Sequence, residues 1–185
     1  MKEKIIRLAP GETHTTADPR ESIVATLGPC IAACVRDPLM GMGGMNHFML
    51  PESESGISSG NPYGAATLFG NFAMEMLINS VLGMGCPRSR LEIRLFGGAD
   101  FTHDKTGGQN IDFILRYLRN DGLEIASSDL GGSQVRRIHF HPVSGKIRRV
   151  FLAGARGAEA IREEGRYRAS HHVAAPQQGA ISFFE

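Results

Sequence analysis

The sequence lacks an excess of charge of one sign, a framework of cysteines and a long apolar run. Its 185 residues include 20 lysines and arginines and 19 acidic residues, for a net charge of +1, so a nucleic-acid-binding protein is not expected. Three cysteines at irregular spacing predict free thiols and not a disulfide framework. No segment approaches the roughly 20 apolar residues that span a bilayer, and the N-terminal residues have no apolar run long enough to predict a signal peptide. We therefore expect a cytoplasmic protein without membrane insertion.

Tryptophan is also absent, whereas the chain has 23 glycines and 9 prolines. This composition predicts many turns, which are typical of proteins that contain β-sheet, so an all-α fold is not expected. The hydrophobic fraction of 42% and the charged fraction of 21% are those of an ordinary globular protein. A chain of this length normally folds as one domain with a substantial core.

Apolar patterns predict strands alternating with two helices. Apolar residues at spacings of three and four predict a core helix that ends at residues 83–85, and a second helix that ends at Gly122. Residues 52–62 contain Ser, Gly, Glu, Asn and Pro without apolar periodicity and predict an exposed loop. A hairpin turn is predicted at residues 142–145. The predicted strands cover residues 23–27, 31–35, 45–50, 91–95, 123–126, 135–140 and 146–152.

A cysteine near a histidine is the main chemical feature of the predicted sheet. Cys30 follows a Gly-Pro bend between the first two buried strands, and the next strand is predicted to return with His47 beside it. Histidine can take the thiol proton, and only the thiolate attacks a carbonyl carbon efficiently. The residues alone leave two interpretations of Cys30 open. It could be a catalytic nucleophile, or it could be a buried small side chain, which is the more frequent role of a single cysteine in an apolar strand. Contact between the two depends on the strand register, which the sequence does not specify.

Six short motifs accompany this pair in a fixed order. The segment LGPCIAACVRDP at residues 27–38 contains Cys30, and the segment GGMNHFMLP at residues 43–51 contains His47, 17 residues later. The other four are YGAA at residues 63–66, FGGA at 96–99, GQN at 108–110 and DLGG at 129–132. Together these motifs resemble the chemoreceptor glutamine deamidase family, CheD, over about residues 22–152.

The resemblance implies an α+β fold in which helices pack on central mixed or antiparallel β-sheets to form a single-domain sandwich. The deamidase domain is expected to cover residues 1–152, with an extended lead-in over residues 1–20 that contains one short strand and no catalytic groups. Residues 153–185 are expected to form a partly flexible tail that holds one short helix. The implied activity is hydrolysis of glutamine side-chain amides in the cytoplasmic domains of chemotaxis receptors, with glutamyl methyl esters as further candidate substrates.

The resemblance also implies a mechanism. Cys30 would attack the amide carbon, His47 would take the thiol proton and protonate the departing ammonia, and water would then cleave the thioester. No metal or organic cofactor is implied. The third family residue is a threonine that orients the histidine, for which Thr26 is the candidate and a main-chain carbonyl the alternative. Pro29 has no N–H to donate to an oxyanion, so the N–H of Cys30 is the expected donor.

Two other functional interpretations remain open. A non-catalytic adaptor that binds receptors and a CheC-type phosphatase would not need the thiol of Cys30, and such a phosphatase is also a candidate partner of a deamidase. A metal-dependent hydrolase or oxidase would use His139 and His141, which share one strand face but have no evident acidic or cysteine partner. Cys34 is expected to be a core thiol. The arginines at 136, 137, 148 and 149 are expected to form a solvated basic hairpin on which an acidic receptor helix could dock.

Overall fold

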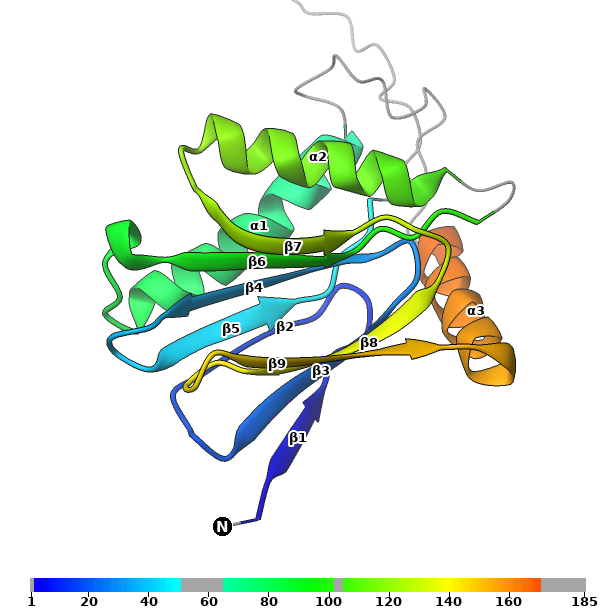
Figure 1. Cartoon of the computed structure of the whole chain (residues 1–185). Coiled ribbons are helices and arrows are strands. Elements are labelled where there is room, and N and C mark those ends of the chain that lie inside the picture. The colour runs from blue at the N-terminus through cyan, green and yellow to red at the C-terminus, as the bar shows by residue number, and fades with distance from the viewer. Residues whose placement is uncertain (1, 51–64, 102–104, 171–185) are drawn as a thin grey trace, which may run out of the picture.

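The computed structural model describes residues 2–50, 65–101 and 105–170, and over this range it contains two β-sheets and three α-helices (Figure 1). The four-stranded sheet has the order β1 (Lys4–Arg7), β3 (Glu21–Leu27), β8 (Val135–His141), β9 (Lys146–Leu152). The five-stranded sheet has the order β2 (Thr13–Thr16), β5 (Met42–Asn46), β4 (Ile31–Asp37), β6 (Glu92–Gly97), β7 (Ile125–Leu130). The helices are α1 (Ala65–Gly83), α2 (Thr106–Asn120) and α3 (Gly154–Ser170), with the short 3-10 helix η1 (Arg88–Arg90).

Each sheet contains one parallel pair, β1 with β3 and β6 with β7, and its other pairs are antiparallel. Both sheets are therefore mixed, and the predicted α+β fold is confirmed. Both long predicted helices are present as α1 and α2. Gly122 follows α2 with φ of 65°, the left-handed conformation that glycine adopts most readily at the end of a helix.

The five-stranded sheet is the middle of three layers. Helices α1 and α2 cover one of its faces, and the four-stranded sheet packs on the other (Figure 1). All residues of β4 are buried, and their alternation divides them between the two interfaces. Ile31 and Val35 pack toward the helices, whereas Ala32 and Cys34 pack between the sheets. Cys34 is thus a core residue, and burial raises the pKa of its thiol.

The strand predicted at residues 45–50 begins and ends earlier, as β5 over Met42–Asn46. Gly43 and Gly44, which precede the predicted strand, lie inside β5, between the neighbouring strands β4 and β2. A Cβ atom on Gly43 would lie 2.3 Å from the Val35 carbonyl oxygen, and one on Gly44 would lie 2.5 Å from the His14 carbonyl oxygen. These glycines therefore permit close backbone approach within the sheet, which the sequence pattern does not distinguish from a turn.

Residues 4–16 and 154–170 are more structured than predicted. The lead-in contributes a strand to each sheet, β1 and β2, and not one strand alone. Helix α3 has 17 residues and packs against β3 and β8 at the end of the strands (Figure 1). The domain boundary at residue 152 stays a prediction, and the predicted loop at residues 52–62 and the last residues, 171–185, lie outside the described range. Within the described parts, no helix combines the length and apolarity that a membrane span requires.

Candidate active site

The β4–β5 hairpin brings Cys30 and His47 together. Cys30 directly precedes β4 and His47 directly follows β5. Pairing of Ile31 with Phe48, in the same register as the rest of the hairpin, places Cys30 and His47 on the same face of the sheet. The sulfur of Cys30 and a ring nitrogen of His47 lie within 4.8 Å of each other. Cys30 has no exposed surface and His47 is 2% exposed, so the pair is closed to solvent.

Both ring nitrogens of His47 have protein partners. Nδ1 lies 3.1 Å from the carbonyl oxygen of Leu8, and Nε2 lies 3.3 Å from Oε1 of Glu164. A carbonyl oxygen can only accept a hydrogen bond, so Nδ1 carries a proton. The main chain of His47 is also held by the lead-in, since its carbonyl accepts from Gly11 N–H at 2.6 Å and its N–H donates to the Glu12 carbonyl at 2.9 Å. The lead-in, expected to carry no catalytic groups, therefore positions the imidazole.

Thr26 lies near this pair without a hydrogen bond to the imidazole in the structure. Its hydroxyl accepts a hydrogen bond from Nε of Arg137 at 3.0 Å, while the Leu8 carbonyl occupies Nδ1 of His47. The assignment of Thr26 as the orienting residue stays a prediction, and these contacts favour the alternative, a main-chain carbonyl. The sequence gives no signal for Leu8, because every residue has a carbonyl group.

A third side chain, Glu164 of α3, completes the cluster and was not predicted. It is 1% exposed, and Gly28 N–H donates to both of its carboxylate oxygens, at 3.0 and 2.9 Å. Burial raises the pKa of the Cys30 thiol well above its usual range, and the negative charge of Glu164 and a hydrogen bond with it raise this pKa further. A raised pKa favours the protonated thiol, which is a poor nucleophile. Nothing in the sequence distinguishes Glu164 from its charged neighbours, and it lies 136 residues from Gly28.

The main chain around Cys30 is fixed by groups from the family-like motifs. The carbonyls of residues 28–30 each accept a hydrogen bond of 2.8 Å, Gly28 from Ala99 N–H, Pro29 from Asn110 Nδ2 and Cys30 from Gly98 N–H. Gly97 has φ of 111°, and a Cβ atom there would lie 2.0 Å from the Cys30 carbonyl oxygen. The FGGA and GQN motifs therefore fix the main chain of residues 28–30, the nucleophile loop.

A cavity of about 280 Å³ adjoins the cluster. Residues 8–10 of the lead-in line it on one side and four residues of α3 line it on another, together with Thr26 and His47. Cys30 does not line this cavity. A substrate side chain could therefore meet the thiol only if a covering group moves.

Within residues 2–50, 65–101 and 105–170, Cys30, His47 and Glu164 form the only group of three or more cysteine, histidine and acidic side chains close enough to share a metal ion. These residue types bind zinc. An ion there would take the sulfur and the ring nitrogen that cysteine catalysis requires, so a metal and the thiol reaction are alternative uses of this site.

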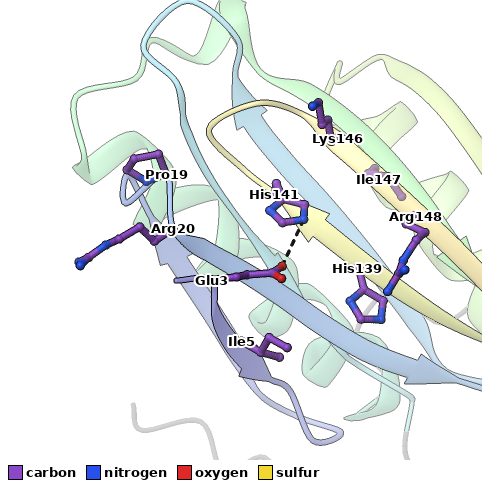
Figure 2. Close-up of a pocket in the computed structure, with 9 residues that line it drawn as sticks. All are labelled: Glu3, Ile5, Pro19, Arg20, His139, His141, Lys146, Ile147 and Arg148. Atoms are coloured by element: carbon purple, nitrogen blue, oxygen red, sulfur yellow. Dashed lines mark ion pairs between the residues drawn. The ribbon is translucent and has the colours of Figure 1, made fainter. Parts of the chain in front are cut away.

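His139 and His141 lie elsewhere, on the outer face of the four-stranded sheet (Figure 2). They line an open cavity of about 900 Å³, and Nε2 of His141 lies 3.6 Å from a carboxylate oxygen of Glu3. Arg20, Lys146 and Arg148 line the same cavity. Burial lowers the pKa of His139, and the positive charges of Arg148 and Arg137 lower it further. The same charges would repel a metal cation, so these contacts do not favour a metal site.

The arginines of the β8–β9 hairpin do not form one solvated face. Arg136 is 2% exposed and donates to the Asp129 carbonyl at 2.7 Å. Arg149 pairs with the Asp129 carboxylate at 2.8 Å, and Arg137 donates to Thr26. The expectation of a solvated basic hairpin is therefore wrong for Arg136, because strand alternation directs it toward β7.

Comparison with known proteins agrees with the resemblance in the sequence. A family model described as "CheD chemotactic sensory transduction" matches residues 49–150. The chain is 41% identical over 183 residues to a protein of Rhizobium rhizogenes strain K84, covering 97% of this chain and 95% of the relative. It is 45% identical over 150 residues to a protein of Caulobacter vibrioides strain NA1000, covering 80% and 78% respectively. Both relatives carry the name "Probable chemoreceptor glutamine deamidase CheD". The chain belongs to the CheD family.

Proposed function

We propose that this protein is a protein-glutamine deamidase that hydrolyses glutamine side chains in the cytoplasmic domains of chemotaxis receptors. The observation that supports it most directly is the buried pair of Cys30 and His47, with Nδ1 of the imidazole fixed by the Leu8 carbonyl at 3.1 Å. Fixing Nδ1 as the protonated nitrogen leaves Nε2 to exchange protons with the thiol and the substrate. The names of the relatives indicate the substrate class. Such an enzyme would work in the cytoplasm, where these receptor domains lie.

The reaction would proceed in two displacements. The sulfur of Cys30 forms a bond to the amide carbon while Nε2 of His47 takes the thiol proton. The carbon–nitrogen bond then breaks, and ammonia leaves with the proton from His47. Water attacks the thioester, His47 takes a proton from it, and the carbon–sulfur bond breaks to release glutamate and restore the thiol. A glutamyl methyl ester would follow the same course, with methanol as the leaving group.

The test is mass spectrometry of a receptor cytoplasmic fragment after incubation with the protein. Conversion of glutamine to glutamate is expected with the wild-type chain and lost with Cys30→Ala. Cys86→Ala serves as a matched control, because Cys86 lies in the link after α1 and not in the site. His47→Ala is expected to slow conversion by about 10²- to 10⁴-fold, the range for loss of a positioned general base. Equal conversion by the wild type and Cys30→Ala would contradict the thiol mechanism.

The adaptor interpretation has one observation in its favour, the complete burial of the Cys30 thiol. An adaptor would bind the receptor fragment, and a CheC-type phosphatase, equally well as wild type and as Cys30→Ala. Binding of both partners without conversion of any glutamine would favour this function. Conversion that depends on Cys30 would favour the deamidase, with the phosphatase as a regulatory partner to be tested by co-purification.

A further inference from the structure

One stripe of α3 faces the active site. The buried residues of this helix are Gly157, Ala160 and Glu164, and the half-buried Tyr167 continues the stripe with spacings of three, four and three residues. Two of these residues have little or no side chain, and a Cβ atom on Gly157 would lie 3.0 Å from the Leu152 carbonyl oxygen. The small residues therefore let the helix approach closely, so that the carboxylate of Glu164 reaches the site.

The carboxylate of Glu164 contacts the groups that deamidation of a glutamine would use. Its oxygens accept from Gly28 N–H at 3.0 and 2.9 Å, and one of them lies 3.3 Å from Nε2 of His47. One of its oxygen atoms lies within 4.8 Å of the Cys30 sulfur. The product of glutamine deamidation is a glutamate side chain, which is the chemical group found here.

We propose that α3 is an internal product analogue, in which Glu164 occupies the subsite of the reacting side chain and must leave before a receptor helix can bind. This inference rests on the proposed function and specifies its substrate more closely. The substrate glutamine would be presented from a helix, with small residues four and seven positions before it, as Ala160 and Gly157 precede Glu164. Gly28 N–H, and not the predicted Cys30 N–H, would donate to the oxyanion.

The contacts of α3 suit a helix that can be displaced. Among the buried residues of α3 only Ala160 contributes an apolar side chain, a single methyl group, and the partly buried Tyr167 adds a contact with the core. The apolar area that holds the helix is therefore small. The helix begins at Gly154, whose φ of 60° forms a sharp junction with β9. The glycine at position 28 makes room for the Glu164 carboxylate, because a Cβ atom on Gly28 would lie 2.5 Å from Oε2 of Glu164. Removing Glu164 would also remove the negative charge that helps to keep the Cys30 thiol protonated.

The decisive experiment turns the product analogue into a substrate. In the full chain carrying Glu164→Gln, the site is expected to hydrolyse the new amide, so that the peptide spanning position 164 regains the mass of glutamate. The double variant Cys30→Ser with Glu164→Gln should keep the amide, and so should Glu159→Gln, which changes an exposed glutamate of the same helix. The conversion should be first order and independent of protein concentration, because it occurs within one chain. Persistence of the amide in Glu164→Gln, while the same preparation deamidates a receptor fragment, would overturn the proposal and leave the proposed function intact.

A second measurement does not depend on catalysis. The rate of alkylation of Cys30 by iodoacetamide is measured by peptide mass spectrometry. If the state in which Glu164 covers Cys30 is populated above about 90% in the wild type, removing the cover in Glu164→Ala should make alkylation at least about tenfold faster. Cys34 and Cys86 are buried thiols away from Glu164 and provide controls within the same chain. Unchanged alkylation of Cys30 would show that Glu164 does not control access to the thiol and would overturn the proposal. Faster alkylation without deamidation of any receptor fragment would support the covering role of α3 and contradict the proposed function instead.

Discussion

Replacing Asn110 would test whether the nucleophile loop is held by the α2 side chain that the structure places behind it. Asn110 is completely buried, its Oδ1 accepts from Leu50 N–H at 2.9 Å, and its Nδ2 donates to the Pro29 carbonyl at 2.8 Å. Asn110→Ala leaves both buried groups unpaired, at a cost of about 1–3 kcal/mol each. The better helix propensity of alanine offsets about 0.5 kcal/mol. The expected loss in the free energy of unfolding is therefore about 1.5–5.5 kcal/mol.

Urea unfolding followed by circular dichroism measures this loss, with Asn79→Ala as the matched control. Asn79 lies on the exposed side of α1 with one hydrogen bond of 3.3 Å, to Glu75, so its replacement should change stability by less than about 0.5 kcal/mol. Asn110→Asp separates the two bonds, because it keeps an acceptor for Leu50 and loses the donor to Pro29. It should lower kcat for deamidation more than it changes KM, since the adjacent Cys30 is misplaced. The reasoning would be refuted if Asn110→Ala and Asn79→Ala unfolded at the same urea concentration.

Two further substitutions test other parts of the structure. Gly97→Ala places an alanine in a left-handed conformation, which costs about 1–2 kcal/mol, and its methyl group pushes on the Cys30 carbonyl. Stability to urea and the rate of deamidation should therefore both fall. Gly83→Ala is the control, because Gly83 has open space around it, and it should change stability by less than about 1 kcal/mol. Hydrogen bonds from Lys4 and His14 lower the pKa of Glu21 from 4.5 to about 2. Ionised Glu21 therefore stabilises the fold at pH values above its ordinary pKa of 4.5, and this contribution is lost as the pH falls toward 2. Glu21→Gln should reduce the difference between urea midpoints at about pH 6 and about pH 3, and an unchanged difference would count against this ion pair.

The central strands and the catalytic pair could be predicted because local signals and one hairpin determine them. Cys30 and His47 flank β4 and β5, so the 16 residues between them are the hairpin itself, and only its register was open. Apolar spacing predicted α1 and α2 for the same reason, since the residues that form the buried face of a helix recur every three or four positions within the helix's own sequence. The start of β5 was placed too late because Gly43 and Gly44 lack the side chains by which a strand pattern is recognised, although they permit close contacts within the sheet.

The remaining site residues could not be predicted because their roles arise from tertiary contacts. Leu8 contributes only a carbonyl oxygen, Gly28 an N–H, and Glu164 a carboxylate from a helix in a charged segment without a recognisable motif. The family model matches residues 49–150 and so does not include these three residues, Cys30 or His47. The geometry of the folded chain is therefore the principal evidence for how the site is assembled.

Gly28→Ala distinguishes the product-analogue interpretation from a purely structural role of Glu164. Gly28 does not adopt a positive φ, so alanine is compatible with its backbone, but the new Cβ would lie 2.5 Å from Oε2 of Glu164. If the carboxylate occupies the substrate subsite, the added methyl group expels Glu164 and also crowds the substrate. Alkylation of Cys30 should then become faster, while deamidation of a receptor fragment becomes slower, by about 100-fold for a misplacement near 1 Å. These opposite directions exclude simple misfolding, which would not leave a folded protein with a more reactive Cys30 and unchanged Cys34 and Cys86. Faster deamidation together with faster alkylation would mean that Gly28 contacts Glu164 but not the substrate, and the oxyanion role would then fall to another N–H.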